Sequence, residues 1–209
     1  MELLLVRHGR PVRVDGSDTE GPADPPLSDE GLEQAERVGA WLAAESIDHV
    51  VTSPVRRARE TAAPLGRLLG IEPEVVPGIG EFDARDASYI PFEEMSRDHE
   101  KFGAMVEGRW TDIEGWEDPE AFRSVAVAAL EGVIERFAGG RVAVFTHAGI
   151  VNVFLGHVLG IERVLWFYPG YTSVSRVAAS REGPRSVVSV NETAHLDPRV
   201  GGPAAGAAR

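Results

Sequence analysis

The chain has 209 residues, of which 43% are hydrophobic and 26% are charged, as is usual for one globular domain. Its formal net charge of -12 disfavours nucleic acid and anionic membrane surfaces as partners, because both attract basic proteins. The absence of Cys excludes disulfides, thiolate metal sites and Cys nucleophiles, and the chain does not begin like a signal peptide, so the expected location is cytoplasmic.

The first predicted element is a short strand at residues 3–6, an apolar run that leads directly into Arg7, His8 and Gly9. A run of this kind is typical of a strand buried in a parallel sheet. Open sheets of that type bind ligands at the carboxyl ends of their strands, where this arginine and histidine would lie. A loop rich in Gly, Pro and Asp follows at residues 11–26.

A helix, a second strand and a second helix are predicted next. Ser28 is expected to cap the first helix, in which apolar residues recur at helical spacing as far as Leu42. A strand is predicted at residues 48–52. Ser53 and Pro54 then form a strong helix start, with Ser as the cap and Pro at the first helical position.

Arginine residues lie in the first turns of this second helix. Arg56, Arg57 and Arg59 stand where free backbone N–H groups and guanidinium groups could together bind an anion. Helix arginines are usually solvated, so each residue alone is a weak indication. Pro64 is expected to kink or end the helix, and Gly70 to close it.

The middle of the chain is its least regular part. A short strand is predicted at residues 74–76, and the poor periodicity of residues 82–117 indicates an irregular lid insertion. Residues 81–120 contain thirteen Asp and Glu against four Lys and Arg, and they include Trp110 and Trp116. A long irregular segment inside a compact domain is typical of a lid or a binding loop, and a disordered excursion is the alternative.

Regular structure is predicted again after the insertion. Asp118 and Pro119 form another cap and first-position pair at the start of a helix. Residues 141–146 form a near-continuous apolar strand that ends at His147, and a helix is predicted at residues 150–159. This strand therefore presents a histidine at its carboxyl end, as the first strand does.

The last predicted strands lie at residues 164–167, 173–178 and 187–190, and residues 198–209 are assigned to a flexible tail without a function. Strands and helices alternate along residues 1–197, which predicts a single α/β domain. Its fold class is a three-layer arrangement with a largely parallel sheet, helices on both faces and the irregular lid insertion.

The predicted topology brings several polar residues together. Parallel strands share a carboxyl edge, so residues that follow different strands should lie along one rim. These residues are Arg7, His8, Ser53, Arg57 and His147. Two histidines and two arginines would form a compact cationic site on an acidic protein, and we interpret it as a site for a phosphoryl group.

Five motifs occur in order along nearly the whole chain. They are LVRHG at residues 5–9, LSDEGLEQA at 27–35, TSPVRRARETA at 52–62, THAG at 146–149 and NETAHL at 191–196. Together they resemble the histidine phosphatase superfamily, in its phosphoglycerate mutase-like branch. The resemblance implies a phosphatase that hydrolyses small-molecule phosphate monoesters through a phosphohistidine intermediate, without a metal or another cofactor.

The resemblance also implies roles for individual residues. His8 matches the family's nucleophilic histidine, and His147 matches the second histidine, which contacts the transferred phosphoryl group. Arg7 and Arg57 match the phosphate-binding arginines, and Glu81 falls where the general acid is expected. The carboxyl group of Glu81 would protonate the leaving oxygen and later accept a proton from the attacking water.

Two assignments stay open in this comparison. Arg10 stands where the family often has Glu or Gln after the RHG triplet, and it is an additional candidate for phosphate binding. Asp83, Glu93 or Glu94 could serve as the general acid in place of Glu81.

Three classes of function are compatible with these residues. Besides the phosphatase, the alternatives are a phosphoglycerate mutase, which returns the phosphoryl group to the substrate, and a non-catalytic phosphate-binding protein on the same fold. The expected partner is a small-molecule phosphate ester, with no nucleic acid or membrane, and the sequence does not indicate an oligomeric state. The acidic lid should disfavour extra anionic groups on the substrate and so favour neutral, bulky leaving groups.

Overall fold

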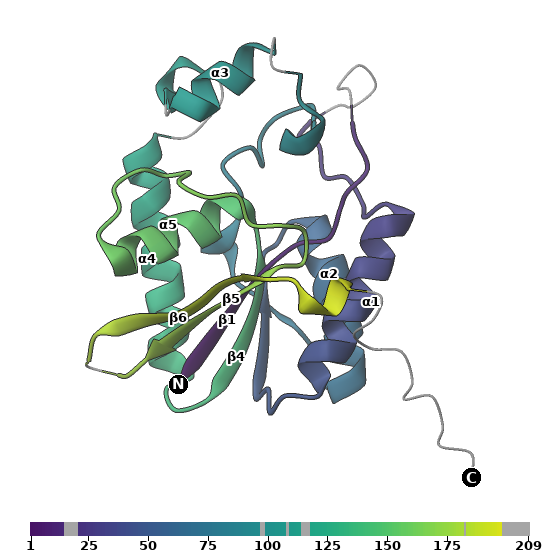
Figure 1. The fold of residues 1–209 in the computed structure, drawn as a ribbon, viewed down its shortest axis with the longest axis vertical. Helices are drawn as coiled ribbons and strands as arrows, with labels where there is room; N and C mark the ends of the chain where they lie inside the picture. The colour runs from purple at the N-terminus through teal and green to yellow at the C-terminus, as the bar shows by residue number, and fades with distance from the viewer. Residues whose placement is uncertain (15–20, 97–98, 108, 114–117, 182, 198–209) are drawn as a thin grey trace.

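The computed structural model describes residues 1–14, 21–96, 99–107, 109–113, 118–181 and 183–197. Within these residues, six strands form one sheet in the order β3-β2-β4-β1-β5-β6 (Figure 1). The strands are β1 (Glu2–Arg7), β2 (His49–Thr52), β3 (Glu74–Val75), β4 (Arg141–Thr146), β5 (Val174–Ala179) and β6 (Arg185–Glu192). The helices are α1 (Asp29–Ala43), α2 (Arg56–Leu69), α3 (Glu100–Glu107), α4 (Pro119–Arg136) and α5 (Ala148–Leu159), with short 3-10 turns at η1 (Pro77–Ile79), η2 (Phe92–Glu94), η3 (Trp110–Asp112) and η4 (Ala194–Leu196). None of the described helices is both long enough and apolar enough to cross a membrane.

The sheet is mixed, with a parallel part and an antiparallel edge. Strands β1, β2, β3 and β4 run parallel, β5 pairs with β1 in the antiparallel sense, and β6 pairs with β5 in the same way. Helices connect the parallel strands, as such connections require, whereas β5 and β6 form a hairpin. In Figure 1, α1 and α2 lie on one side of the sheet, and α4 and α5 lie on the other. The predicted three-layer α/β fold is therefore confirmed.

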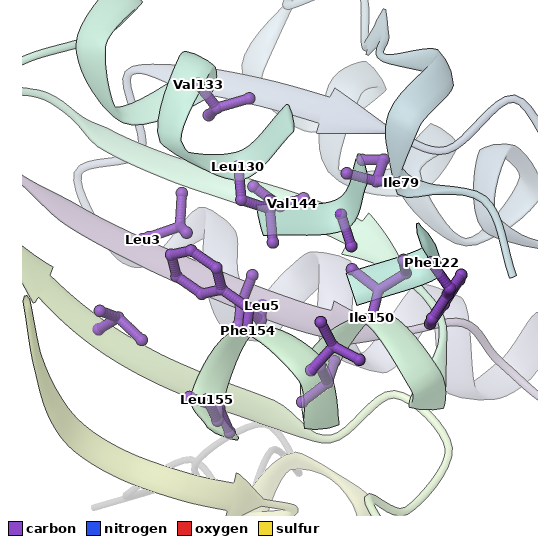
Figure 2. Close-up of a cluster of buried hydrophobic side chains, with 14 of the residues drawn as sticks. Leu3, Leu5, Ile79, Phe122, Leu130, Val133, Val144, Ile150, Phe154 and Leu155 are labelled. Carbon is purple, nitrogen blue, oxygen red and sulfur yellow. The ribbon is translucent and has the colours of Figure 1, made fainter. Parts of the chain in front are cut away.

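Two clusters of buried side chains fill the spaces between these layers. Leu3 and Leu5 of β1 face α4 and α5, where they belong to the cluster shown in Figure 2. Leu4 and Val6 alternate with them and face α1 and α2. All four side chains are fully buried, and burying each contributes roughly 1.5–3 kcal/mol. Burial on both faces explains why β1 is an unbroken apolar run.

Two helix starts agree with the predicted caps. Ser28 Oγ accepts a hydrogen bond from Gly31 N at the start of α1. Asp118 accepts hydrogen bonds from Glu120 N and Ala121 N at the start of α4. These side chains satisfy backbone N–H groups that have no partner inside the helix. Both predicted caps are confirmed.

Helix α2 differs from the prediction at its first residue and at Pro64. It begins at Arg56 with Val55 as its cap, because Ser53 Oγ accepts from Val55 N and so forms a turn before the helix. Pro64 lies inside the helix, which continues to Leu69, so an end of the helix at this proline, one of the two expected outcomes, is wrong. The proline packs closely against a glycine of α1, and this tertiary contact outweighs the lost backbone hydrogen bond.

The predicted strand at residues 164–167 is wrong. This segment has no regular structure, because its backbone bonds to a side chain of α5 instead of a neighbouring strand. Trp166 N and Phe167 N both donate to Asn152 Oδ1, at 2.9 and 3.1 Å, and Trp166 Nε1 donates to Asn152 O at 3.0 Å. A contact between distant residues thus replaces the strand pairing that the local sequence favours.

The acidic insertion contains short helical pieces, η2, α3 and η3, in its described part. It lies at the top of Figure 1, beyond the carboxyl end of β1. Trp110 is the first residue of η3, whereas Trp116 and the predicted tail at residues 198–209 lie outside the described residues. The described part of the insertion is therefore in the region where an open sheet binds its ligand.

Candidate active site

The carboxyl ends of three parallel strands meet at one edge of the sheet. His8 N, just after β1, donates to Thr146 O at 2.9 Å. Ser53 N, just after β2, donates to Phe145 O at 2.9 Å. His147 follows β4, the strand that lies between these two. The topology thus brings both histidines and Ser53 together, as the alternating pattern predicts.

The His8 ring is held with one nitrogen ready to act as a nucleophile. Its Nδ1 donates to Gly9 O at 2.8 Å, which places the proton on Nδ1 and leaves a lone pair on Nε2. Arg57 Nε donates to that Nε2 at 3.3 Å. Burial, together with the charges of Arg57 and Arg7, lowers the pKa of His8 well below its ordinary value. The imidazole is therefore neutral near pH 7, as a nitrogen nucleophile must be.

Backbone packing fixes the loop that carries His8. Gly9 N donates to Thr61 Oγ1 at 2.9 Å, which ties the loop to α2. Thr61 Oγ1 in turn donates to Arg57 O at 2.6 Å. On the other side, a Cβ atom on Gly9 would lie 2.7 Å from Gly31 O in α1, so only glycine fits there. The loop is clamped between two helices, and the His8 ring is positioned with it.

His147 is fully buried beside His8, with 5.2 Å between the two ring centroids. Its Nε2 lies 2.8 Å from Ser53 Oγ, which also accepts a hydrogen bond from Val55 N. This arrangement lets the Ser53 hydroxyl donate to Nε2, which places the imidazole proton on Nδ1. Among the described residues, the buried Nδ1 has no hydrogen-bond partner. It is therefore an unused donor next to the ring of His8.

Arg7 is almost completely buried and is held by three oxygen atoms. Its Nη1 donates to Pro169 O at 2.7 Å, to Glu93 Oε1 at 3.0 Å and to Tyr168 Oη at 3.1 Å. The ring centroid of Tyr171 lies 4.0 Å from its Cζ, a cation–π distance. Arg7 Nε is buried without a partner in the described part of the chain. The guanidinium is thus fixed in position and keeps a donor for an incoming anion.

Arg57 is also buried, whereas the arginine that precedes it is not. Arg57 Nη2 lies 3.3 Å from Asp83 Oδ1, and the ring centroid of Tyr89 lies 4.4 Å from its Cζ. Arg56 is half exposed and pairs with Glu60 in the next turn of α2. Successive helix residues point about 100° apart, so only one of the two arginines faces the strand ends.

Glu81 follows η1 and lies against the start of α5. Its carboxylate oxygens accept hydrogen bonds from Gly149 N at 3.0 Å and from Phe82 N at 3.2 Å. A Cβ atom on Gly149 would lie 2.2 Å from Glu81 Oε1, so this contact needs glycine. Burial and the negative charge of Asp83 raise the pKa of Glu81 to about 8. The carboxyl group is therefore largely protonated at neutral pH, as a proton donor must be.

Each of the alternative carboxylates is paired with an arginine. The pairs are Asp83–Arg57, Glu93–Arg7 and Glu94–Arg10. Although burial acts in the opposite direction, the charge of Arg7 holds the pKa of Glu93 below its usual value. Glu93, kept ionised in this way, is a poorer acid than a protonated carboxyl group, whereas burial raises the pKa of Asp83 despite the opposing charge of Arg57, so Asp83 stays an alternative acid. The choice of Glu81 as the general acid stays a prediction, and this geometry supports it.

A cavity of about 340 Å³ opens beside these residues, a size in the range of small-molecule sites. Four of the predicted site residues line it, namely Arg7, His8, Arg57 and Glu81. In the described part of the chain, no group of three His, Asp or Glu side chains is arranged to hold a metal ion. The cavity therefore brings a histidine, two arginines and a carboxyl group to one space.

Two of the predicted site residues lie outside the lining of this cavity. His147 is buried next to His8, and the residue after it, Ala148, is part of the lining. The Arg10 side chain is 40% exposed and pairs with Glu30 at 2.6 Å and with Glu94 at 2.5 Å. A role for Arg10 in phosphate binding stays a prediction, and these two carboxylates pair with its guanidinium group.

Three tyrosines and His99 belong to the site, although the sequence patterns do not indicate them. Tyr89, Tyr168 and His99 line the cavity, and Tyr171 packs on the guanidinium of Arg7. All of them lie in segments without a clear period, so no local signal marks them. Their position beside the arginines results from the tertiary fold alone.

Comparison with known proteins identifies related sequences and folds. The family model described as "Histidine phosphatase superfamily (branch 1)" matches residues 3–193. A probable phosphoglycerate mutase, GpmB, from Yersinia enterocolitica is 27% identical over 212 residues, which cover 94% of this chain and 95% of that protein. Among solved structures, a phosphoserine phosphatase mutant from Entamoeba histolytica in complex with phosphoserine has a TM-score of 0.74 at 20% identity, covering 93% of this chain and 98% of that chain.

A second solved structure has the same fold. It is a mycobacterial glucosyl-3-phosphoglycerate phosphatase in complex with VO3, with a TM-score of 0.73 at 21% identity, covering 92% of this chain and 99% of that chain. The family match spans nearly all of the chain and includes the first four motifs and the start of the fifth, so the resemblance seen in the sequence is confirmed. The chain belongs to the histidine phosphatase superfamily, branch 1.

Proposed function

We propose that this protein is a metal-independent phosphatase, which hydrolyses small-molecule phosphate monoesters through a phosphohistidine intermediate. The observation that carries the proposal is the His8 ring, whose unprotonated Nε2 lies 3.3 Å from Arg57 Nε in the lining of the cavity. Two structural neighbours are named as phosphatases, which favours hydrolysis as the reaction.

In the first step, His8 Nε2 attacks the phosphorus atom while the bond from phosphorus to the ester oxygen breaks. Glu81 donates its proton to the departing oxygen, so an alcohol leaves and phosphohistidine remains. Arg7 and Arg57 bind the non-bridging oxygens, and His147 Nδ1 supplies a further donor. Donors that are already fixed stabilise the charge of the transition state without having to reorient.

In the second step, a water molecule attacks the phosphorus of phosphohistidine, and the bond to His8 Nε2 breaks. The Glu81 carboxylate accepts a proton from that water and so returns to its acid form. Inorganic phosphate leaves, and the imidazole is again neutral. One carboxyl group thus acts as acid in the first half-reaction and as base in the second.

A phosphoglycerate mutase is the second candidate, because the Yersinia relative is named as a probable enzyme of that kind. In a mutase the phosphoryl group returns to a hydroxyl of the substrate and not to water. The products formed from 3-phosphoglycerate separate the two candidates: a mutase yields 2-phosphoglycerate, whereas a phosphatase yields glycerate and inorganic phosphate.

Hydrolysis of p-nitrophenyl phosphate is expected to continue in excess EDTA and to be inhibited by vanadate. Vanadate mimics the five-coordinate phosphorus of the transition state and would bind the same arginines. The measurement is release of p-nitrophenol with and without the chelator, and a magnesium-dependent phosphatase serves as the control for metal removal. Activity that strictly requires an added divalent metal would contradict the proposed mechanism.

Arg57→Ala is expected to lower kcat about 10²- to 10³-fold, because it removes a buried donor from oxygens that gain charge in the transition state. Arg56→Ala is the matched control, since it removes the same side chain from a position that is half exposed and pairs with Glu60. Steady-state kinetics with p-nitrophenyl phosphate measure both variants. Equal losses of kcat in the two variants would contradict the proposal that Arg57 binds the reacting phosphoryl group.

A further inference from the structure

The cavity extends beyond the reacting residues into an apolar space. Its apolar side chains come mainly from two segments, residues 82–105 and 165–167, and include Phe82, Ile90, Met95, Met105, Leu165 and Phe167. Phe82 and Met105 are each only 7% exposed. Methionine side chains adapt to bound groups of different shapes. A lining of this composition favours the carbon body of a ligand.

Carboxylates of the protein already hold most of the cationic residues in the lining. The pairs are Arg7–Glu93 at 3.0 Å, Arg57–Asp83 at 3.3 Å and Lys101–Asp86 at 2.6 Å. Arg163 also lines the cavity and is exposed. A phosphoryl group can use donors of Arg7 and Arg57 that point away from these pairs, whereas a second anionic group would come close to Asp83 and Asp86. Like charges at such a partly buried site disfavour binding.

Resting on the phosphatase function proposed above, we infer that the substrate is the phosphate monoester of an uncharged, largely apolar alcohol. The phosphoryl group binds at His8 with Arg7 and Arg57, and the carbon body of the alcohol packs against the apolar side chains of residues 82–105 and 165–167. The two structural neighbours are named for phosphoserine and for glucosyl-3-phosphoglycerate, compounds that carry a carboxylate. This chain would differ from them in the leaving group that it accepts.

A series of n-alkyl phosphates tests the inference. Ethyl, butyl, hexyl and octyl phosphate have similar leaving-group chemistry and differ in apolar area. The value of kcat/KM should rise about two- to fourfold for each methylene group that enters the cavity, as expected from the burial of that area. 3-Phosphoglycerate and phosphoserine should be poor substrates in the same assay. A flat series, or a preference for either of these anionic esters, would overturn the inference.

A charge placed in the apolar lining should remove this dependence on chain length. Ile90→Lys should lower kcat/KM for octyl phosphate roughly tenfold or more, and ethyl phosphate should change little. Leu68→Lys is the matched control, because Leu68 is 53% exposed on α2 and lies outside the lining. Circular dichroism and thermal melting check the fold of each variant, and Met95→Lys replaces Ile90→Lys if the latter does not fold. An unchanged chain-length series in a folded lysine variant of the lining would overturn the inference.

Failure of this inference can be told apart from failure of the proposed function. p-Nitrophenyl phosphate reports the chemistry with an activated leaving group, and acid-labile phosphate on the protein reports phosphorylation of His8. Formation of phosphohistidine together with a flat alkyl series overturns the substrate class alone. The absence of phosphohistidine with every ester overturns both.

Discussion

Replacement of His8 by alanine is expected to abolish phosphate release and the phosphoenzyme together. In the proposed reaction His8 Nε2 forms the bond to phosphorus, so the variant loses the covalent step itself, and kcat should fall on the order of 10⁴- to 10⁶-fold. Steady-state phosphate release measures the rate. Quenching with radiolabelled substrate detects the phosphohistidine, which is labile in acid and stable in base.

Two further histidine variants make this result specific. His157→Ala is the matched control, because His157 is exposed in the last turn of α5, and the variant should keep the wild-type rate. His147→Ala should still form phosphoenzyme, but slowly, because it loses a donor to the phosphoryl group and keeps the nucleophile. Acid-labile phosphate at wild-type levels on His8→Ala would show that another residue is the nucleophile.

The regular elements and the rim of the site could be predicted because their signals are local. The apolar run before Arg7 and the near-continuous apolar run before His147 each mark a strand buried on both faces. Ser28 and Asp118 mark helix starts through bonds to backbone groups two or three residues away. Once the strands are parallel, their carboxyl ends must share an edge, so His8 and His147 are expected at that edge.

The rest of the site could not be predicted, because it depends on contacts between distant residues. Arg7 is separated from Glu93 by 86 residues, and from Tyr168 by 161. No period or spacing in the sequence indicates such pairs. The same cause explains the wrong strand at residues 164–167, where the side chain of Asn152 takes the backbone hydrogen bonds. Local propensity is outweighed wherever a tertiary contact offers the backbone a better partner.

The electrostatics of the site separate its two titratable groups His8 and Glu81. Burial and nearby cations lower the pKa of His8, so the imidazole stays neutral and nucleophilic. Burial and the charge of Asp83 raise the pKa of Glu81 to about 8, so its carboxyl group stays protonated at neutral pH. Groups whose environments shift their pKa values in opposite directions are suited to act as nucleophile and acid in one reaction.

Glu81→Gln is therefore expected to slow esters with poor leaving groups far more than activated ones. Hydrolysis of an alkyl phosphate should fall about 10²- to 10⁴-fold, because the alcohol must be protonated as it leaves. The p-nitrophenolate ion needs little protonation, so the loss with p-nitrophenyl phosphate should be much smaller. Glutamine keeps the volume of the side chain and can still accept a hydrogen bond from Gly149 N. The measurement is kcat for both esters with wild type and variant.

The pH dependence of turnover should report the protonation of Glu81. Because the pKa of Glu81 is raised to about 8, its acid form is present below that pH and is lost above it. Turnover of an alkyl phosphate by the wild type should therefore decline as the pH rises past about 8. Glu81→Gln should lack this decline, and its low rate should stay constant over the same range.

Asp83→Asn is the matched control for both measurements, since Asp83 is the neighbouring alternative acid and pairs with Arg57 at 3.3 Å. Its charge is one of the causes that raise the pKa of Glu81, so its removal should move the alkaline decline to lower pH. At pH values below the shifted decline, where Glu81 keeps its proton, the two esters should be slowed to a similar extent, because the change then acts on Arg57 and not on the proton that the leaving group receives. If Asp83→Asn slows the alkyl ester selectively at these low pH values as well, Asp83 is the general acid and the assignment of Glu81 is wrong.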